Sequence, residues 1–194
     1  MKQPILFASS NKHKLSEMQF LFSQSKWEIV SPQSIGIQTL NIAEHGHSYM
    51  QNALFKIEAY EKYTNLPILA DDSGLEVDYL NGNPGVFSAR FGGSNINNDQ
   101  QRNNFLIKLM SKASTNQRLA VFKAVLVVRF YKAQTIIREG NIRGNIASEP
   151  RGENGFGYDP IFQLNNGETM AEYGEKKHEI SHRALAVKSL LEVM

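Results

Sequence analysis

The stretch ILADDSGLEV, residues 68–77, places two neighbouring acids inside an otherwise apolar segment. Its first three residues predict a buried strand, which we expect to end at Asp71 and Asp72 before the apolar pattern resumes at Leu75. Burying a carboxylate is unfavourable unless a cation or hydrogen-bond donors compensate it. The two acids therefore require a compensating partner.

The segments on either side of this strand read first as alternating helices and strands, then as paired strands. Apolar residues at helical spacing predict helices over residues 12–23, 48–60 and 99–110, and a last helix from Ser181. Strands are expected at residues 4–9 and 27–30, and as a pair at residues 120–131 and 135–147 with a polar break at 132–134. This order indicates an α/β fold with a long mixed central sheet flanked by helices.

Composition narrows the class of protein. The chain has 194 residues, 41% of them hydrophobic, a formal net charge of +2 and no cysteine. A disulfide framework, a thiol nucleophile and a cysteine zinc site are therefore excluded. Without a basic stripe, a signal segment or an apolar membrane span, we expect a cytoplasmic protein with no nucleic-acid or membrane partner. We expect a single domain over residues 1–194.

The segment SSNKHK, residues 9–14, follows the first strand and opens the first helix. Backbone N–H groups at a helix start, together with hydroxyls, an amide and Lys14, suit an anion. The segment lacks the glycines of a P-loop. Taken alone, it is better explained by Ser10 or Asn11 capping the helix.

Glu44 supplies a third acid, just before the second helix. A strand–helix–strand arrangement can bring it to the same sheet edge as Asp71 and Asp72. Clustered carboxylates at such an edge suit a hard divalent cation, usually Mg²⁺, shared with substrate phosphates. An Asx-turn that Asp71 or Asp72 makes with Ser73 and Gly74 explains the aspartates equally well. From these residues alone both interpretations remain open.

Two later segments contain further candidate groups. RGENGFGYDPIF, residues 151–162, has glycines that permit close approach and aromatic rings that can stack on a nucleobase, or it is a turn that its aromatics anchor to the core. KKHEISHR, residues 176–183, offers donors for a carbonyl oxygen or a phosphate, or Ser181 only caps a helix there. Neither segment decides the function alone.

The order of these segments along one chain is more specific than any one of them. SSNKHK, AEHG followed by NALFK, ILADDSGLEVDYLNGNPGVFSARFGG, PRGENGFGYDPIF and ISHRALA resemble the family of non-standard purine nucleoside triphosphate pyrophosphatases, the inosine and xanthosine triphosphatases. The likeness extends from residue 5 to residue 191. It implies two lobes around a long sheet, an active-site cleft, a homodimer, and Mg²⁺-dependent hydrolysis of ITP, dITP and XTP to the monophosphate and pyrophosphate.

The resemblance also implies roles for individual residues. Asp72 is the catalytic carboxylate by this likeness, and it shares the metal with Glu44. The residues expected to hold the triphosphate are Ser9, Ser10, Asn11, Lys12, His13, Lys14 and Ser73. The residues expected to hold the nucleoside are Phe156, Gly157, Tyr158, Asp159, Lys177, His182 and Arg183.

The chain departs from the family pattern at the second helix. Gln51 stands where family members often have Glu, and His45 stands in a segment that is commonly Glu-Thr-Gly. A metal ligand at Glu44 is unaffected, whereas a supporting acid at position 51 is lost. We therefore expect this departure to affect the affinity for the metal or the choice of metal.

The mechanism expected from these groups is positioning and electrostatics, with no covalent intermediate. Lys14, and Lys56 on the inner face of the second helix, would add positive charge near the phosphates, and Asp72 or Asp71 would orient water toward the α-phosphorus. Donors on His182 and Arg183 match the 6-keto oxygen of hypoxanthine and xanthine, and an unpaired buried donor facing adenine costs about 1–3 kcal/mol. Rejection of GTP needs contacts at the 2-position, and the candidates are Asp159 or a backbone carbonyl.

Two alternatives remain. One is a pyrophosphatase for modified pyrimidine triphosphates, against which the two-ringed base pocket expected from residues 151–162 and 181–183 argues. The other is a non-catalytic nucleotide- or RNA-binding module, which predicts binding without turnover. The acids would repel a nucleic-acid backbone.

Overall fold

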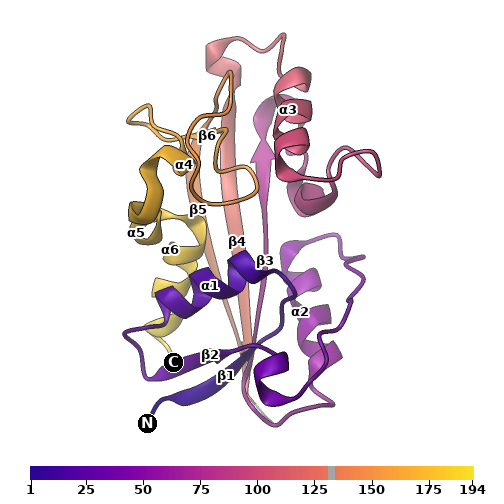
Figure 1. Ribbon diagram of the computed structural model, residues 1–194, viewed down its shortest axis with the longest axis vertical. Coiled ribbons are helices and arrows are strands. Elements are labelled where there is room, and N and C mark those ends of the chain that lie inside the picture. Colours follow the sequence, from indigo (N-terminus) through magenta and orange to yellow (C-terminus); the bar gives the residue numbers. More distant parts are fainter. Residues whose placement is uncertain (131–133) are drawn as a thin grey trace. The chain divides into compact units, whose positions relative to one another are not determined.

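A six-stranded mixed sheet contains every strand of the described residues, which in this computed structural model are 1–130 and 134–194 (Figure 1). The strand order is β2-β1-β3-β4-β5-β6. The strands are β1 (Gln3–Phe7), β2 (Trp27–Val30), β3 (Ile68–Val77), β4 (Leu119–Arg129), β5 (Thr135–Ile146) and β6 (Phe162–Gln163). β1 pairs in parallel with β2 and β3, whereas β5 and β6 are antiparallel. The mixed sheet is therefore confirmed.

All four helices that the apolar spacing predicts are present. The helices are α1 (Lys12–Leu21), α2 (Tyr49–Tyr60), α3 (Asp99–Leu109), α4 (Met170–Tyr173), α5 (Lys177–Ile180) and α6 (His182–Leu191). The side chains of Asn11, Ser48 and Asn98 cap α1, α2 and α3 by accepting a backbone N–H three residues further on. The sequence did not predict α4, α5 and β6, because each is too short to show a period.

β3 does not end at its two acids. It runs ten residues, through Asp71 and Asp72 to Val77, so the expectation that the strand ends there is wrong. The physical reason is compensation, because both carboxylates meet cationic side chains within ion-pair distance. A strand can continue through a buried acid when a partner offsets the cost of desolvation.

β4 and β5 are neighbours in the sheet, as the expected pair of strands requires. The polar break expected between them, residues 132–134, lies outside the described residues except for its last position. β4 is buried along most of its length, and β5 is mostly half-buried or exposed.

The chain divides into two compact units, each with its own apolar core. Unit 1 comprises Met1–Asp72, Ala124–Gly140 and Arg183–Met194, and unit 2 comprises Ser73–Lys123 and Asn141–His182. The core of unit 1 contains Phe7, Met18 and Leu126, and that of unit 2 contains Leu75, Leu106 and Phe162. The expectation of one domain with a cleft stays a prediction.

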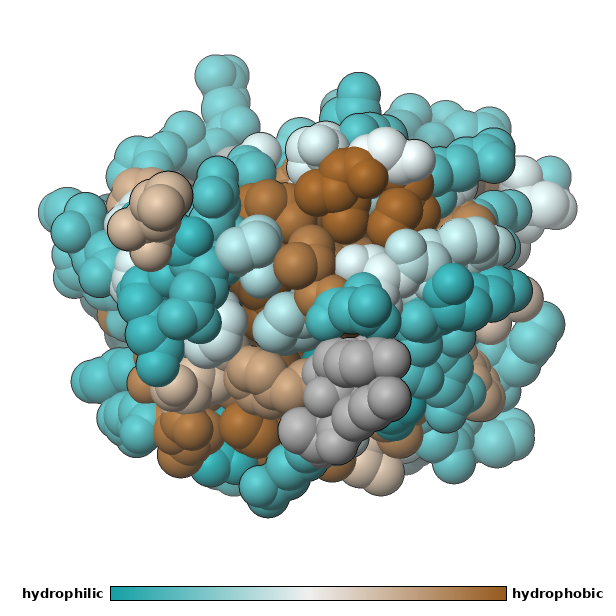
Figure 2. Space-filling view, turned by 90° about the horizontal axis from the view of Figure 1, so that it is seen from below, coloured by the Kyte–Doolittle hydropathy of each residue, from teal (hydrophilic) through white to brown (hydrophobic). Residues whose placement is uncertain are grey.

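Several large apolar side chains are exposed at the surface, among them Phe20, Tyr63 and Phe87. Figure 2 shows one face, on which several apolar residues gather within a hydrophilic surround. Scattered apolar exposure is ordinary on folded proteins and by itself assigns no partner. In the part of the chain that the structure describes, no helix has both the length and the apolar character that crossing a membrane requires.

Two residues of α1 provide a test of the unit 1 core. Met18 is fully buried, and Phe20 on the same helix is 55% exposed. We expect Met18→Ala to lower the free energy of unfolding by about 2–5 kcal/mol, because it leaves a cavity among packed side chains. Phe20→Ala is the matched control and should change it by about 0.5 kcal/mol or less. Urea unfolding measures both, and equal effects would contradict this placement of the core.

Candidate functional site

The two acids of β3 have separate sets of partners. Successive side chains of a strand point to opposite faces. Asp71 lies 3.2 Å from Lys14 Nζ on α1 and 2.6 Å from Arg183 Nε on α6. Asp72 instead accepts hydrogen bonds from two side chains of α2, Asn52 Nδ2 at 3.0 Å and Lys56 Nζ at 2.9 Å. The alternation of the strand therefore gives the neighbouring acids different environments.

Asp71 belongs to a buried network of charges. Its carboxylate is fully buried, and Arg183, which contacts it, also pairs with Glu17 on α1. Burial opposes ionisation, but Arg183 and Lys14 outweigh it and hold the pKa of Asp71 well below its usual range. Burial also lowers the pKa of Lys14, despite the nearby Asp71. The Asp71 carboxylate is therefore favoured in its ionised form by side chains of two helices, α1 and α6.

Asp72 and Glu44 converge on one ammonium group. Lys56 Nζ lies 2.9 Å from Asp72 Oδ1 and 2.7 Å from Glu44 Oε1. It also donates to the backbone carbonyl of Asp71 at 2.9 Å. Burial raises the pKa of Asp72, Lys56 only partly offsets this, and Glu44 adds to the rise. Lys56 stays charged, because Asp72 and Glu44 outweigh its burial and raise its pKa.

The structure confirms that the SSNKHK segment caps a helix. Asn11 Oδ1 accepts the backbone N–H of Lys14 at 3.1 Å, and Ser9 Oγ accepts that of Asn11 at 3.2 Å. Ser10, Lys12 and His13 are exposed. Of the six residues, Lys14 is the one whose side chain reaches Asp71. Capping and anion binding are compatible, since both use the start of the helix.

Asp159 organises the glycine-rich loop. Its carboxylate accepts the backbone N–H of Phe156 at 3.1 Å and pairs with Lys177 Nζ at 2.9 Å. Gly155 has a φ of +81°, and a Cβ there would overlap the Asp159 carboxylate, so this turn requires glycine. Lys177 Nζ also lies 5.3 Å from the centre of the Phe156 ring. The predicted nucleoside residues Phe156, Asp159 and Lys177 therefore form one cluster.

The two sides of this loop are fixed by other elements of unit 2. The hydroxyl of Tyr158 donates to the Ser88 carbonyl at 2.9 Å, so Tyr158 anchors the loop to the core, as the simpler interpretation expected. Gly157 accepts from Asn103 Nδ2 at 3.0 Å and donates to Asp99 Oδ2 at 2.7 Å, both on α3. The loop is therefore held from two directions.

His182 packs against an aromatic side chain. Its ring stacks on Phe122 of β4, with centroids 4.7 Å apart and an interplanar angle of 17°. The side chain is 8% exposed. The stack limits rotation of the imidazole, which is what a residue that reads a ligand by its ring nitrogens needs.

Sequence reasoning missed four residues that hold predicted site residues in place: Glu17 and Asn52 in unit 1, and Asp99 and Asn103 in unit 2. A signal existed for the first two, because Glu17 lies three residues after Lys14 and Asn52 lies four residues before Lys56. Helical residues three or four apart share a face. When a helical lysine is suspected of binding an acid, a polar residue one turn away on the same buried face is a candidate to contact the same group. For Asp99 and Asn103 the sequence offered no such link to the loop.

The side chain of Gln51 holds the backbone of the loop that precedes α2. Its Oε1 accepts the N–H of His47 at 2.8 Å, and its own N–H donates to Ser48 Oγ at 3.2 Å. An amide oxygen accepts such a bond as a carboxylate does. The replacement of Glu by Gln therefore preserves this contact, and its effect on metal affinity stays a prediction.

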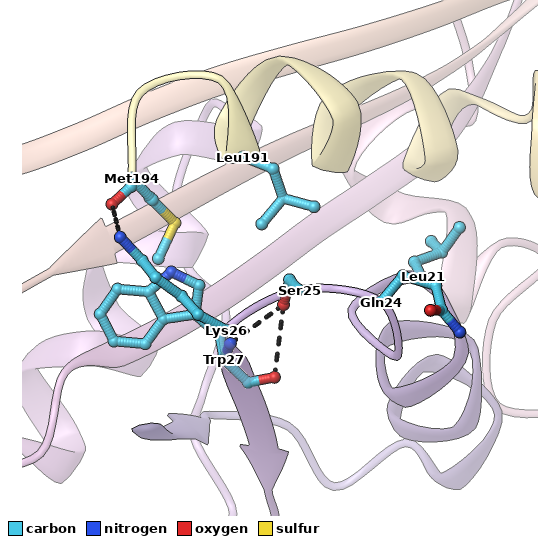
Figure 3. A pocket seen from close by; sticks show the side chains of 7 residues that line it. All are labelled: Leu21, Gln24, Ser25, Lys26, Trp27, Leu191 and Met194. Atoms are coloured by element: carbon cyan, nitrogen blue, oxygen red, sulfur yellow. Dashed lines mark hydrogen bonds between the residues drawn. The ribbon is translucent and has the colours of Figure 1, made fainter. Parts of the chain in front are cut away.

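A pocket of about 440 Å³ in unit 1 lies among residues other than the predicted site residues. It is lined by Leu21, Gln24, Ser25, Lys26, Trp27, Leu191 and Met194. Figure 3 shows Lys26 Nζ donating to the Met194 carbonyl beside the Trp27 ring. No Asp, Glu or His lines the pocket, so it has no carboxylate or imidazole to act as a general base.

Comparison with known proteins identifies the relatives of this chain. The Ham1 family model matches residues 5–193. The dITP/XTP pyrophosphatase of Bacillus subtilis is 40% identical over 196 residues, covering 100% of this chain and 98% of that protein. An enzyme of the same name from Thermus thermophilus is 40% identical over 190 residues, covering 97% of this chain and 90% of that protein. A Ham1 protein structure from Coxiella burnetii matches with a TM-score of 0.86 and 37% identity, covering 98% of each chain.

The raised pKa of Asp72 predicts a cost in stability. A carboxyl that binds its proton more tightly when folded loses native stability as pH rises above the unfolded pKa, about 3.9. In metal-free buffer, Asp72→Asn should therefore raise the free energy of unfolding at pH 7, and the gain should shrink as the pH falls below 4. Urea unfolding at both pH values measures this.

The exposed Asp78 provides the control, since Asp78→Asn should change the free energy of unfolding at pH 7 by about 0.5 kcal/mol or less. An Asp72→Asn protein less stable than the parent at pH 7 would show that the charge of Asp72 stabilises the fold.

Proposed function

This chain belongs to the Ham1 family, and from that membership we propose that it hydrolyses non-standard purine nucleoside triphosphates to the nucleoside monophosphate and pyrophosphate. XTP, dITP and ITP are the proposed substrates. The main support for this proposal is a sequence identity of about 40%, over nearly the whole chain, with enzymes named dITP/XTP pyrophosphatases. The sequence had led to the same family.

The pair Glu44 and Asp72 fits a divalent cation. Their oxygens already meet at one cationic atom, Lys56 Nζ, at 2.7 and 2.9 Å. Among the described residues no three His, Asp or Glu side chains form a metal cluster. Mg²⁺ suits such a sparse site, because it keeps waters and is completed by substrate phosphates. Bound there, Mg²⁺ would supply charge neutralisation to the triphosphate.

We assign binding of the triphosphate and orientation of the attacking water mainly to side chains of unit 1. Lys14 and Lys56 would neutralise phosphate oxygens, and we assign the neighbouring hydroxyls, amide and backbone N–H groups of residues 9–14, with Ser73, to hold the triphosphate. Asp72 would orient a water in line with the α-phosphorus. Asp71 was an alternative for that step, but its carboxylate is already held by Arg183 and Lys14, which favours Asp72.

We assign recognition of the base to Phe156, Asp159, Lys177, His182 and Arg183, with Gly157 and Tyr158 shaping the loop. This assignment is supported by contacts of these residues with one another and with their neighbours, such as the ion pair between Lys177 and Asp159 at 2.9 Å. Glu17 and Asp71 fix the guanidinium of Arg183 and keep it charged, since they raise its pKa against the effect of burial. Fixed donors facing a 6-keto oxygen would disfavour adenine.

Further properties rest on the family resemblance, for the dimer, and on the charge and hydropathy pattern of the sequence, for location and partners. We propose assembly as a homodimer, a cytoplasmic location, and no nucleic-acid or membrane partner. Hydrolysis of modified pyrimidine triphosphates and nucleotide binding without turnover are the competing functions, and the names of the relatives favour neither.

A substrate panel tests the proposal. Pyrophosphate release should be measured with XTP, dITP, ITP, GTP, ATP and a modified pyrimidine triphosphate, with Mg²⁺ and with EDTA. We expect the first three to exceed ATP in kcat/KM by about 100-fold, the gain from two mismatched buried donors. EDTA should abolish turnover. Equal rates for ATP and ITP would contradict the purine proposal, and binding of XTP without pyrophosphate release would favour the binding module.

A further inference from the structure

Asn52 uses both ends of its side-chain amide, although the side chain is fully buried. Its Nδ2 donates to Asp72 Oδ2 at 3.0 Å, and its Oδ1 accepts the backbone N–H of Gly46 at 2.8 Å. One side chain of α2 therefore joins β3 to the loop that carries Glu44.

The chemistry of this position requires an amide. The Gly46 N–H can only donate, and an ionised Asp72 carboxylate can only accept, so the two partners fix the orientation of the Asn52 side chain. An aspartate at position 52 would keep the acceptor for Gly46 but would lose the donor to Asp72. An apolar residue of similar size would leave the buried Gly46 N–H unpaired and would remove one of the side-chain donors to Asp72, which is costly.

Gly46 allows the loop to approach this closely. A Cβ at position 46 would lie 2.6 Å from Asn52 Oδ1 and 2.8 Å from Gln51 Cβ, closer than real side chains pack. The next residue, His47, is held by Gln51 Oε1 at 2.8 Å. Gln51 and Asn52, both at the start of α2, thus hold the two loop residues that lie two and three positions after Glu44.

Lys56 completes the arrangement one turn further along α2. Asn52 contacts Asp72 Oδ2 while Lys56 contacts Asp72 Oδ1, and Lys56 also reaches Glu44. Because Asn52 holds the Asp72 carboxylate on one side and the Glu44 loop on the other, it acts on both acids.

We propose that Asn52 is a positioning residue, which sets the mutual placement of Glu44 and Asp72 and thereby their affinity for a divalent cation. It touches neither the substrate nor the cation itself. The relevance of this role to catalysis rests on the proposed function. The predicted effect on cation affinity does not depend on it.

The test is Mn²⁺ binding to the protein alone, without added phosphate or pyrophosphate, followed by the EPR signal of the free ion. We expect Asn52→Ala and Asn52→Asp to weaken Mn²⁺ binding by about 10- to 100-fold, the usual effect of removing a group that orients a ligand. Gly46→Ala should do the same, because the new Cβ displaces the loop from Asn52. If both Asn52 variants fail to fold, Gly46→Ala alone decides.

Met18→Ala is the control for loss of stability, because Met18 is fully buried in α1 and belongs to the apolar core of unit 1. It should bind Mn²⁺ like the parent protein. Mn²⁺ affinity within threefold of the parent in folded Asn52→Ala and Gly46→Ala proteins would overturn the proposal. An equal loss in Met18→Ala would also overturn it, because the effect would then reflect stability alone.

The outcome is separable from that of the substrate panel. If the parent protein hydrolyses XTP but the Asn52 variants bind Mn²⁺ normally, the positioning role is wrong and the proposed function stands. If the parent hydrolyses no non-standard triphosphate but loses Mn²⁺ affinity with Asn52, the proposed function is wrong and the positioning role stands.

Discussion

The structure depends on compensating two adjacent carboxylates that β3 carries into buried surroundings. Because successive side chains of a strand alternate in direction, Asp71 pairs with Lys14 and Arg183. Asp72 accepts hydrogen bonds from Asn52 and Lys56. If one of these acids lacked its partners, a buried charge would be left uncompensated, which is strongly destabilising. The positions of α1, α2 and α6 in unit 1 follow from this requirement as well as from apolar packing.

The two acids differ in how fully they are compensated. Asp71 has two cations, one of them shared with Glu17, and its pKa is lowered against the effect of burial. Asp72 shares its single lysine with Glu44, and its pKa is raised by burial. A carboxylate held in this less favourable state is a candidate for chemistry, because a cation or a substrate that compensates it can gain binding energy there. We therefore propose a stabilising role for Asp71 and a functional one for Asp72.

Much of this organisation could be predicted from the sequence. Apolar spacing indicated α1, α2, α3 and α6, and the order of short motifs indicated the family. The sequence could not show that β3 continues through Asp71 and Asp72, because that depends on partners that are up to 112 residues away. Asn52 was overlooked for a related reason, since an asparagine within an apolar helical stripe has no meaning until its two partners are known. The short elements α4, α5 and β6 are too brief for periodicity to detect.

The division of roles between the two acids can be measured directly by single-turnover pyrophosphate release from XTP with Mg²⁺, using Asp71→Asn and Asp72→Asn proteins at a temperature where both are folded. The account predicts that Asp72→Asn slows release by about 100-fold or more, the contribution of a positioned acid or base. Asp71→Asn should retain more of the rate and should lose mainly stability. Release at the parent rate by Asp72→Asn, with loss of release confined to Asp71→Asn, would contradict the account.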